Sequence, residues 1–282
     1  MVPGAWVRAL TRVAIIAAMA GELKPLVRGW AHARRNGVDV WRWKSGGGEW
    51  VAACAGAGVD AATRAFAEIE RDGAVDQVIS IGWAGALSEE FKAGKAYWVA
   101  GAIDARTGER FRTQAWEDES VDSHPSDKNP PRRIARVGRP DLSQSLPGHP
   151  DDCWLVTSAR VADGQEKQRL AAAYGAGLVD MEAAGVARLA QMRGIPFYCV
   201  KGVSDGPTDK LPDFNRFISA NGRFQVVGFV LFVLLRPWYW LGLMRMGENS
   251  RKAAQGIRES LLETLDGRGA ITQRNGYPNL KR

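Results

Sequence analysis

The sequence is poor in cysteine, and this scarcity excludes two ways of stabilising a fold. Cys54, Cys153 and Cys199 lie far apart and are odd in number, so they fit neither a zinc-ligand spacing nor a disulfide framework. Each cysteine lies in an apolar run, which favours buried, reduced thiols in a cytoplasmic protein. We expect no metal site, and nothing in the sequence indicates a cofactor.

A continuous apolar run long enough to cross a membrane is also missing. Residues 226–244 are strongly apolar, but Arg236 and Pro237 interrupt them near the middle, and a membrane-spanning helix needs roughly 20 apolar residues. Two interpretations stay open: a helix packed on the body of the protein, or an interfacial segment that contacts a membrane surface through its aromatic side chains. Near the N-terminus, residues 13–19 are apolar, but Glu22 follows closely and no signal peptide is predicted.

Basic residues outnumber acidic ones, but no nucleic-acid-binding motif accompanies them. The chain has 38 Lys and Arg against 31 Asp and Glu, a formal net charge of +7. This charge would suit an acidic partner such as nucleic acid, anionic lipid or a phosphorylated substrate. One basic cluster at residues 132–139 and a second at the C-terminus lie outside any recognised motif. We interpret them as a solvated basic surface and expect no nucleic acid partner.

Apolar segments of strand length alternate with segments of helical periodicity along most of the chain. This alternation predicts an α/β fold with a central mixed β-sheet. The predicted strands cover residues 12–18, 77–81, 97–103, 154–158, 178–179 and 197–203, and a hairpin pairs 38–44 with 50–55 around a glycine turn. The predicted helices cover 21–32, 59–71, 163–174 and 181–192. A polar insertion at about 107–150, with room for a strand or two in its early part, interrupts the pattern.

Three acidic residues stand at junctions between predicted strands and helices: Glu22, Glu182 and Asp205. Each alone is more often a helix cap or a turn residue than a catalyst. All three, however, belong to one edge of the same predicted sheet, where open α/β sheets bind ligands. Two glycine-rich turns, at 55–58 and 82–85, open on that edge and would let a ligand approach the backbone closely. The pattern therefore indicates a ligand site there.

These segments give the sequence its resemblance to the nucleoside phosphorylase/nucleosidase superfamily, and most closely to the 5'-methylthioadenosine/S-adenosylhomocysteine nucleosidases. The Met-Glu-Ala and Ser-Asp motifs are the specific part. The matching segments keep the family's order and spacing, and they are 15–22, 55–58, 81–87, 179–184 and 203–205. The resemblance implies a three-layer α/β/α fold with a catalytic domain at 11–222. An apolar, helical extension at 223–266 would follow, with a final helix at 249–265, and 267–282 would form a disordered tail.

The resemblance also gives the three acids roles. Asp205 would be the general acid that protonates or hydrogen-bonds N7 of the departing purine, oriented by Ser204. Glu182 would accept hydrogen bonds from the ribose hydroxyls and favour the cationic transition state, while Met181 packs against the sugar. Glu22 would be the general base that deprotonates the attacking water, and its charge would repel phosphate.

Two positions depart from the family pattern. Trp83, which follows Gly82 in the turn after the central strand, replaces a small hydroxyl residue that binds phosphate in phosphorylases. Lys201 stands where these nucleosidases have an arginine near the nucleophile; it keeps the positive charge, loses the bidentate geometry and could still hold phosphate. Val161 falls roughly where the family places a residue that stacks on the base. These four residues complete the predicted substrate-binding set.

Three functions remain open. The first is a nucleosidase that hydrolyses the N-glycosidic bond of a 5'-modified adenosine, such as methylthioadenosine or adenosylhomocysteine, and releases adenine. The second is a phosphorylase or nucleosidase for a lipid-linked, adenosylhopane-like adenosine in hopanoid synthesis, because the apolar tail is similar to that of hopanoid-associated phosphorylases. Such a tail would form an apolar lid beside the purine site, although a larger core or a dimer contact would also account for it. The third is a nucleoside-binding protein without catalysis, against which the three retained acids argue.

The expected partners follow from the same resemblance. The substrate is a small nucleoside, and either water or phosphate is the nucleophile. The family implies a homo-oligomer, here a dimer. We expect a cytoplasmic protein, with contact between residues 226–244 and a membrane surface as an open alternative.

Overall fold

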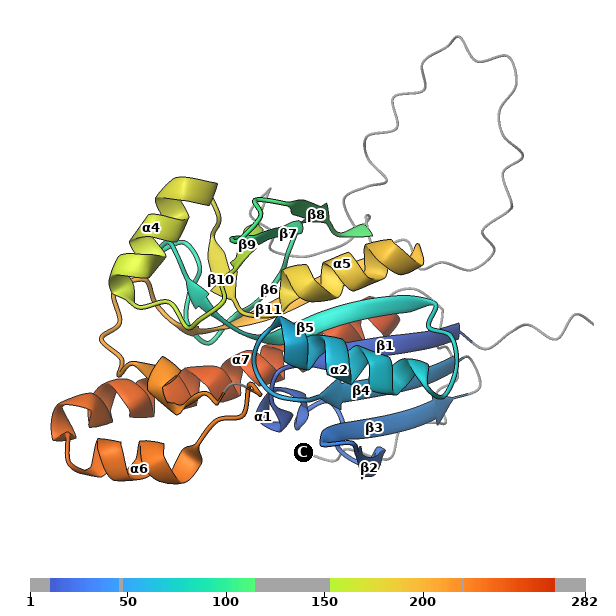
Figure 1. Ribbon diagram of the computed structural model, residues 1–282, viewed down its shortest axis with the longest axis horizontal. Coiled ribbons are helices and arrows are strands. Elements are labelled where there is room, and N and C mark those ends of the chain that lie inside the picture. The colour runs from blue at the N-terminus through green and yellow to red at the C-terminus, as the bar shows by residue number, and fades with distance from the viewer. Residues whose placement is uncertain (1–10, 46–47, 115–152, 220, 267–282) are drawn as a thin grey trace, which may run out of the picture.

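A computed structural model describes residues 11–45, 48–114, 153–219 and 221–266 of the chain. Over these residues the chain forms a mixed β-sheet with helices on both faces (Figure 1). The strands found in this part of the chain are β1 (Thr11–Ala17), β2 (Ala31–Arg35), β3 (Val38–Ser45), β4 (Gly48–Cys54), β5 (Gln77–Ala86), β6 (Ala96–Trp98), β7 (Gly101–Asp104), β8 (Arg110–Arg112), β9 (Trp154–Thr157), β10 (Leu178–Asp180) and β11 (Phe197–Asp205).

The sheet contains both parallel and antiparallel pairs, and β5 at its centre has parallel neighbours in β1 and β11 and an antiparallel one in β10. The strand order is β2-β3-β4-β1-β5-β10-β9-β7-β8, and β11 pairs with both β5 and β6. β1 runs parallel to β4 and β5, and β11 runs parallel to β5. β2 with β3, β3 with β4, β5 with β10 and β6 with β11 are antiparallel. The predicted mixed sheet and the predicted hairpin are confirmed.

Helices cover both faces of this sheet. α2 (Val59–Glu70) and α5 (Ala183–Arg193) pack on one face in a single hydrophobic cluster. α1 (Ala20–Leu23) and the long C-terminal helix α7 (Trp240–Asp266) contribute Leu23, Ile257 and Leu261 to the cluster on the other face. Because β1 and β11 are covered on both sides, nearly every residue in them is buried, which explains their continuous apolar sequences. The three-layer α/β/α fold is confirmed.

A glycine allows α7 to lie directly against the central strands. A Cβ atom at Gly202 of β11 would stand 2.7 Å from Cβ of Ala253 and 3.1 Å from its backbone, which is closer than packed carbon atoms approach. Ala253 and Ala254 are themselves fully buried. The second half of α7 is thus a layer of the fold, while the predicted domain boundary near residue 222 stays a prediction.

Two predicted elements are wrong. The helix predicted over 21–32 ends after four residues at Leu23, because Pro25 cannot continue a helical hydrogen-bond ladder and Gly29 adopts a φ of 86°. Residues 31–35 form the edge strand β2 instead. The single strand predicted over 97–103 is two strands with different neighbours, since β6 pairs with β11 whereas β7 pairs with β8 and β9. The other predicted strands and helices up to residue 203 occur near their predicted limits, with β5 and β11 longer than expected.

The apolar residues 226–244, here called the apolar elbow, form a bent pair of helices. α6 (Val226–Leu234) ends before the predicted break at Arg236-Pro237, a short 3-10 turn η2 (Pro237–Tyr239) follows, and α7 then continues through the predicted final helix. No residue of α6 is fully buried, but Phe229 and Phe232 pack against Phe217. One side of α6 is therefore packed on the body, and both interpretations of 226–244 stay open. Among the described helices none is long and apolar enough by itself to cross a membrane; α6 and the following helix meet that criterion only as a pair, bent by 107°.

The early part of the polar insertion contains β8, as predicted. Residues 115–152, with the basic cluster at 132–139, and the predicted tail at 267–282 lie outside the described residues.

The three cysteines are buried and free, as predicted, and burial raises the pKa of the Cys54 thiol to about 12. Within the described part of the chain, no cluster of three or more His, Cys, Asp or Glu side chains could hold a metal ion.

Candidate active site

The three predicted acids come together in one pocket at the carboxyl-terminal end of the central strands. Glu22 follows β1, Glu182 follows β10, and Asp205 ends β11. The pocket has a volume of about 170 Å³. Seven of the nine predicted site residues line it, namely Glu22, Trp83, Val161, Met181, Glu182, Ser204 and Asp205. The other two, Gly82 and Lys201, do not line it but lie close to the acids that do.

The Glu22 carboxylate is held by backbone donors. Oε2 accepts hydrogen bonds from the amides of Ala18 at 2.8 Å and Met19 at 2.9 Å, and Oε1 accepts one from the amide of Trp83 at 2.9 Å. Burial raises the pKa of Glu22 above its ordinary value, although these amides and the Lys201 charge oppose the shift. A fixed carboxylate with a raised pKa is suited to accept a proton near neutral pH.

Gly82 makes room for that carboxylate. Its φ is 143°, a conformation that side-chain-bearing residues rarely adopt, and a Cβ atom there would stand 3.0 Å from Oε1 of Glu22. The prediction of a turn at 82–85 is wrong, because these residues continue β5 and pair with β11. Gly82 instead lets this strand pass close to the Glu22 carboxylate.

Glu182 faces the pocket instead of capping its own helix. It occupies the N-cap position of α5, but its side chain makes no cap hydrogen bond; Oε1 accepts instead from the amide of Gly58 at 2.7 Å, in the first glycine-rich turn. Burial, reinforced by the nearby charge of Asp180, raises the pKa of Glu182 to about 8, against the opposing charge of Lys201. The interpretation of Glu182 as a simple cap is thus excluded.

Lys201 forms a buried ion pair with Asp180. Their side chains are 1% and 0% exposed, and Nζ lies 2.9 Å from Oδ2. Burial opposes the ammonium charge, but the Asp180 carboxylate outweighs it and raises the pKa of Lys201 above its ordinary value. Asp180 also accepts from Oγ1 of Thr157 at 2.7 Å and from the amide of Ala183 at 2.9 Å, so it caps α5 in place of Glu182. Lys201 is therefore an electrostatic neighbour of the two glutamates, and its charge is paired with Asp180, which lies at the pocket wall.

Asp205 is paired with a lysine that the sequence analysis did not identify. Nζ of Lys167 donates to Oδ2 of Asp205 and to the carbonyl oxygen of Gly206, and the hydroxyl of Ser204 donates to Oδ1. The Lys167 side chain is 4% exposed and comes from α4 (Gly164–Tyr174). Its stem passes Gly85, where a Cβ atom would stand 3.0 Å from Cε. A signal was available, because Lys167 precedes the buried Leu170 by three residues and so shares its inward helical face.

Trp83 connects the pocket to the C-terminal helix. Its indole Nε1 donates to the carbonyl oxygen of Ser250 in α7 at 2.9 Å, and its ring packs so closely on Gly21 that a Cβ atom there would stand 3.1 Å away. Trp83 thus closes one side of the pocket with an apolar surface at the position where a hydroxyl residue was expected.

Val161 is fixed by a side chain that sequence reasoning also missed. Asn215, in the 3-10 turn η1 (Phe214–Phe217), accepts from the Val161 amide at 2.8 Å and donates to the Val161 carbonyl at 2.9 Å. This reciprocal pair joins the loop before α4 to the segment that leads into the apolar elbow.

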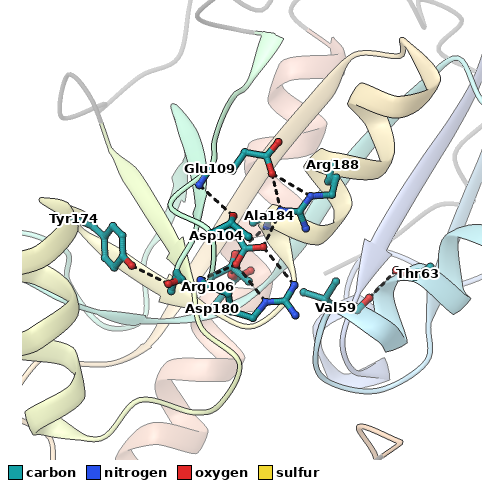
Figure 2. A network of polar contacts seen from close by, with 12 residues as sticks. Val59, Thr63, Asp104, Arg106, Glu109, Tyr174, Asp180, Ala184 and Arg188 are labelled. Carbon is teal, nitrogen blue, oxygen red and sulfur yellow. Dashed lines mark hydrogen bonds and ion pairs between the residues drawn. The ribbon is translucent and has the colours of Figure 1, made fainter.

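Two further cavities adjoin the pocket. One, of about 410 Å³, is lined by Gly58, Arg160 and Met181 and by a polar rim. Figure 2 shows Asp104 and Arg106 of this rim. Arg188 reaches from α5 to Asp104 at 2.9 Å and to Glu109 at 2.8 Å. The other is a groove of about 1480 Å³ that shares with the pocket Met19, Trp83, Phe214, Phe224 and Met246.

Comparison with known proteins agrees with this geometry. The family model for the phosphorylase superfamily matches residues 12–225. Futalosine hydrolase of Helicobacter pylori superposes with a TM-score of 0.61 at 14% identity, covering 92% of this chain and 98% of that one. The 5'-methylthioadenosine/S-adenosylhomocysteine nucleosidase from Neisseria meningitidis, in complex with methylthio-immucillin-A, also gives 0.61, at 18% identity over 92% of this chain and 100% of that one.

No match is found among curated proteins. At these identities the solved structures establish the fold alone, whereas the family model covers most of the chain. The chain therefore belongs to the phosphorylase superfamily of nucleoside phosphorylases and nucleosidases.

Proposed function

We propose that the protein is a purine nucleosidase that hydrolyses the N-glycosidic bond of a 5'-modified adenosine and releases adenine. The observation that carries this proposal is the convergence of Glu22, Glu182 and Asp205 on one small buried pocket, each held by different backbone or side-chain partners. Cleavage of this bond builds positive charge on the ribose and negative charge on the base. Acids at separate positions can serve the two halves.

Asp205 serves the base. As the bond between C1' and N9 breaks, its electron pair moves into the purine, and a proton delivered to N7 lets the base leave neutral. Asp205 supplies this proton from its carboxyl group and becomes a carboxylate. Lys167 and Ser204, which donate to its two oxygens, fix its orientation and stabilise the carboxylate that the proton transfer leaves. Val161, tied to Asn215, lies at the pocket wall where it would pack on the base.

Glu182 and Met181 serve the sugar. An ionised Glu182 accepts hydrogen bonds from the ribose hydroxyls and stabilises the cationic ring, while Met181 packs on the sugar face. Because the pKa of Glu182 is about 8, this ionised form becomes dominant only in mildly alkaline solution or when the developing cation lowers that pKa.

Glu22 serves the nucleophile. It accepts a proton from water while the resulting hydroxide adds to C1', so the products are adenine and the free sugar. Three features support water over phosphate. The Glu22 carboxylate repels an anion, Trp83 replaces the phosphate-binding hydroxyl, and the Lys201 charge is already satisfied by Asp180.

The direct test is adenine release from methylthioadenosine and adenosylhomocysteine in phosphate-free buffer. We expect release without phosphate, and loss of at least about 10²-fold in kcat for Glu22→Gln and for Asp205→Asn. The exposed Glu89→Gln is the matched control and should retain full activity. Adenine release that depends on added phosphate would contradict the proposal of a hydrolase and favour a phosphorylase. A wild-type protein that binds nucleosides without turnover would favour the noncatalytic alternative.

The second candidate function is action on a lipid-linked, adenosylhopane-like adenosine, as a nucleosidase or a phosphorylase. The groove of about 1480 Å³ favours it, because this groove opens from the pocket and includes Phe214, Phe224, Phe229 and Leu243. A long 5' apolar chain would occupy it. Comparing kcat/KM for methylthioadenosine with that for an adenosine carrying a long 5' alkyl chain tests this candidate, with and without phosphate. Equal or lower kcat/KM for the long-chain substrate would count against it.

Assembly as a homodimer also stays a proposal, and it is supported by the fact that members of the family usually form oligomers. Static light scattering of the purified protein measures it, and a mass equal to a single chain would contradict it. The predicted contact of residues 226–244 with a membrane surface likewise stays a proposal.

A further inference from the structure

The apolar elbow, residues 226–244, exposes most of the large apolar side chains on the described surface. Of the twelve exposed large hydrophobic residues among the described ones, ten lie in the elbow, with exposed fractions from 46% to 78%: Val226, Val227, Val230, Leu231, Leu234, Leu235, Trp238, Trp240, Leu241 and Met244. In Figure 1 α6 and the first turns of α7 extend beyond the edge of the sheet. A contiguous apolar patch of this kind marks a contact with another protein or with lipid.

The inner side of the elbow is already packed, so its outer side has no place on the body. Phe229 and Phe232 of α6 contact Phe217 edge-to-face, with ring centroids 5.3 Å apart in both pairs, and Phe224 contacts Phe229 at 5.2 Å. These aromatic contacts attach α6 to η1 beside the pocket. The exposed aliphatic residues of α6 are Val226, Val227, Val230, Leu231 and Leu234.

Polar groups at the bend are satisfied within the elbow itself. The indole Nε1 of Trp240 donates to the carbonyl oxygen of Val233 at 2.8 Å, and the amide of Arg236 donates to the same carbonyl at 2.9 Å. The Arg236 guanidinium donates to the Phe232 carbonyl at 3.0 Å and lies 3.8 Å from the centre of that ring. Internal satisfaction of the backbone is what a segment needs to enter a medium without water.

The charge around the elbow selects between lipid and a second copy of the chain. From position 214 to 247 the sequence has four arginines and no Asp or Glu. The groove beside the elbow adds Lys24, Arg28, Arg251 and Arg258 against one acid, Glu259. Two copies joined through this face by a two-fold axis would set these like charges near one another. Anionic lipid headgroups would complement them, and Trp238, Tyr239 and Trp240 at the bend are residue types that favour the boundary between headgroups and acyl chains.

We propose that the apolar elbow inserts into one leaflet of an anionic membrane and anchors the enzyme on its surface. α6 has nine residues, a length of about 14 Å, which reaches less than half of the roughly 30 Å hydrocarbon core. Insertion places the groove, through Phe229 and Leu243, at the lipid surface, and the groove leads to the pocket at Trp83 and Met246. Entry of a 5' apolar chain from the bilayer by this path rests on the proposed function, whereas membrane insertion does not.

Flotation of the full-length protein with vesicles tests the insertion without any substrate. We expect binding to phosphatidylglycerol/phosphatidylcholine vesicles, weaker binding to phosphatidylcholine alone, and partial release at about 0.5 M salt. The variant Leu231→Gln/Leu234→Gln/Leu235→Gln/Trp238→Gln should bind at least about tenfold more weakly. Met192→Gln, at an equally exposed position on α5, is the control and should bind as wild type.

Three further measurements make the result decisive. Brominated acyl chains should quench tryptophan fluorescence in the wild type and much less in Trp238→Phe/Trp240→Phe, which retains apolar side chains. Thermal unfolding checks that the variants fold, and activity on methylthioadenosine should be unchanged in both because none of the substituted residues lines the pocket or the groove. Equal vesicle binding by wild type and the four-residue variant, or no binding by wild type, overturns the proposal. A fall in molecular mass on the four-residue substitution, with no vesicle binding, would assign the surface to a contact between copies.

Discussion

The backbone amide of Trp83 donates a hydrogen bond of 2.9 Å to Oε1 of Glu22, across 61 residues of sequence. The same tryptophan donates through its ring to Ser250 of α7. One residue therefore fixes the proposed general base and ties it to the helix that continues from the apolar elbow. The conformation of β5 at Trp83, together with the Ala18 and Met19 amides, consequently fixes where the Glu22 carboxylate lies.

Gly82→Ala tests that dependence. The substitution forces a Cβ atom into a backbone with φ of 143° and to 3.0 Å from the Glu22 carboxylate, so we expect destabilisation of about 1–3 kcal/mol and a lower kcat from displacement of Glu22. Urea unfolding and steady-state kinetics measure the two effects. Gly164→Ala is the control, because a Cβ atom at that position would have no neighbouring atom within 4 Å; if both variants behaved alike, the close approach at Gly82 would have no consequence.

Lys201→Met tests the buried ion pair. Removing the ammonium leaves Asp180 charged, fully buried and without its closest cation, which we expect to cost about 3–5 kcal/mol of unfolding free energy. The double variant Lys201→Met/Asp180→Asn should recover part of this loss because no unpaired charge remains. Lys252→Met removes a lysine that is paired with Glu248 on the surface and should leave stability nearly unchanged. A stable Lys201→Met protein would show that the pair is dispensable.

Lys167→Met tests whether the unpredicted lysine positions Asp205. The Asp205 carboxyl would keep its contact with Ser204 and lose the one with Lys167, so we expect kcat to fall about 10²-fold, with KM changing less. The basic limb of the pH–rate profile, which reports the general acid, should be displaced. Lys167→Arg should restore part of the rate. Arg169→Met, on the outer face of the same helix, is the control. An unchanged pH profile in Lys167→Met would reduce Lys167 to a structural role.

The raised pKa of Glu182 predicts how the free energy of unfolding depends on pH. Its pKa is raised in the folded protein from 4.5 to about 8, so between these values the folded state holds a proton that the unfolded state has released. The contribution of Glu182 to stability is therefore complete below about pH 4.5 and is lost as the pH rises through about 8. Urea unfolding across this range should give a falling free energy for wild type and a shallower fall for Glu182→Gln. Parallel pH dependence in the two proteins would contradict the raised pKa.

The sequence predicted the acids of the site because each lies in a short local motif at the end of an apolar strand. Glu22, Glu182 and Asp205 could be placed on one edge of the sheet without knowing any long-range contact, and all three line the pocket. The helix predicted over 21–32 failed for a local reason, since Pro25 and Gly29 ended it despite its apolar spacing. Lys167 was missed because its partner, Asp205, lies 38 positions away.

Sequence alone thus determined the α/β pattern, the superfamily and the identity of the three acids, because strand burial and motif residues are local properties. Tertiary structure alone decided which partner each charge has: Asp180 for Lys201, Lys167 for Asp205, and backbone amides for Glu22. It also decided that the apolar elbow stays on the surface, although its composition would equally suit a buried helix. The physical reason is that burial and pairing depend on which distant segments the folded sheet brings together, and the hydrophobic pattern of one segment does not contain that information.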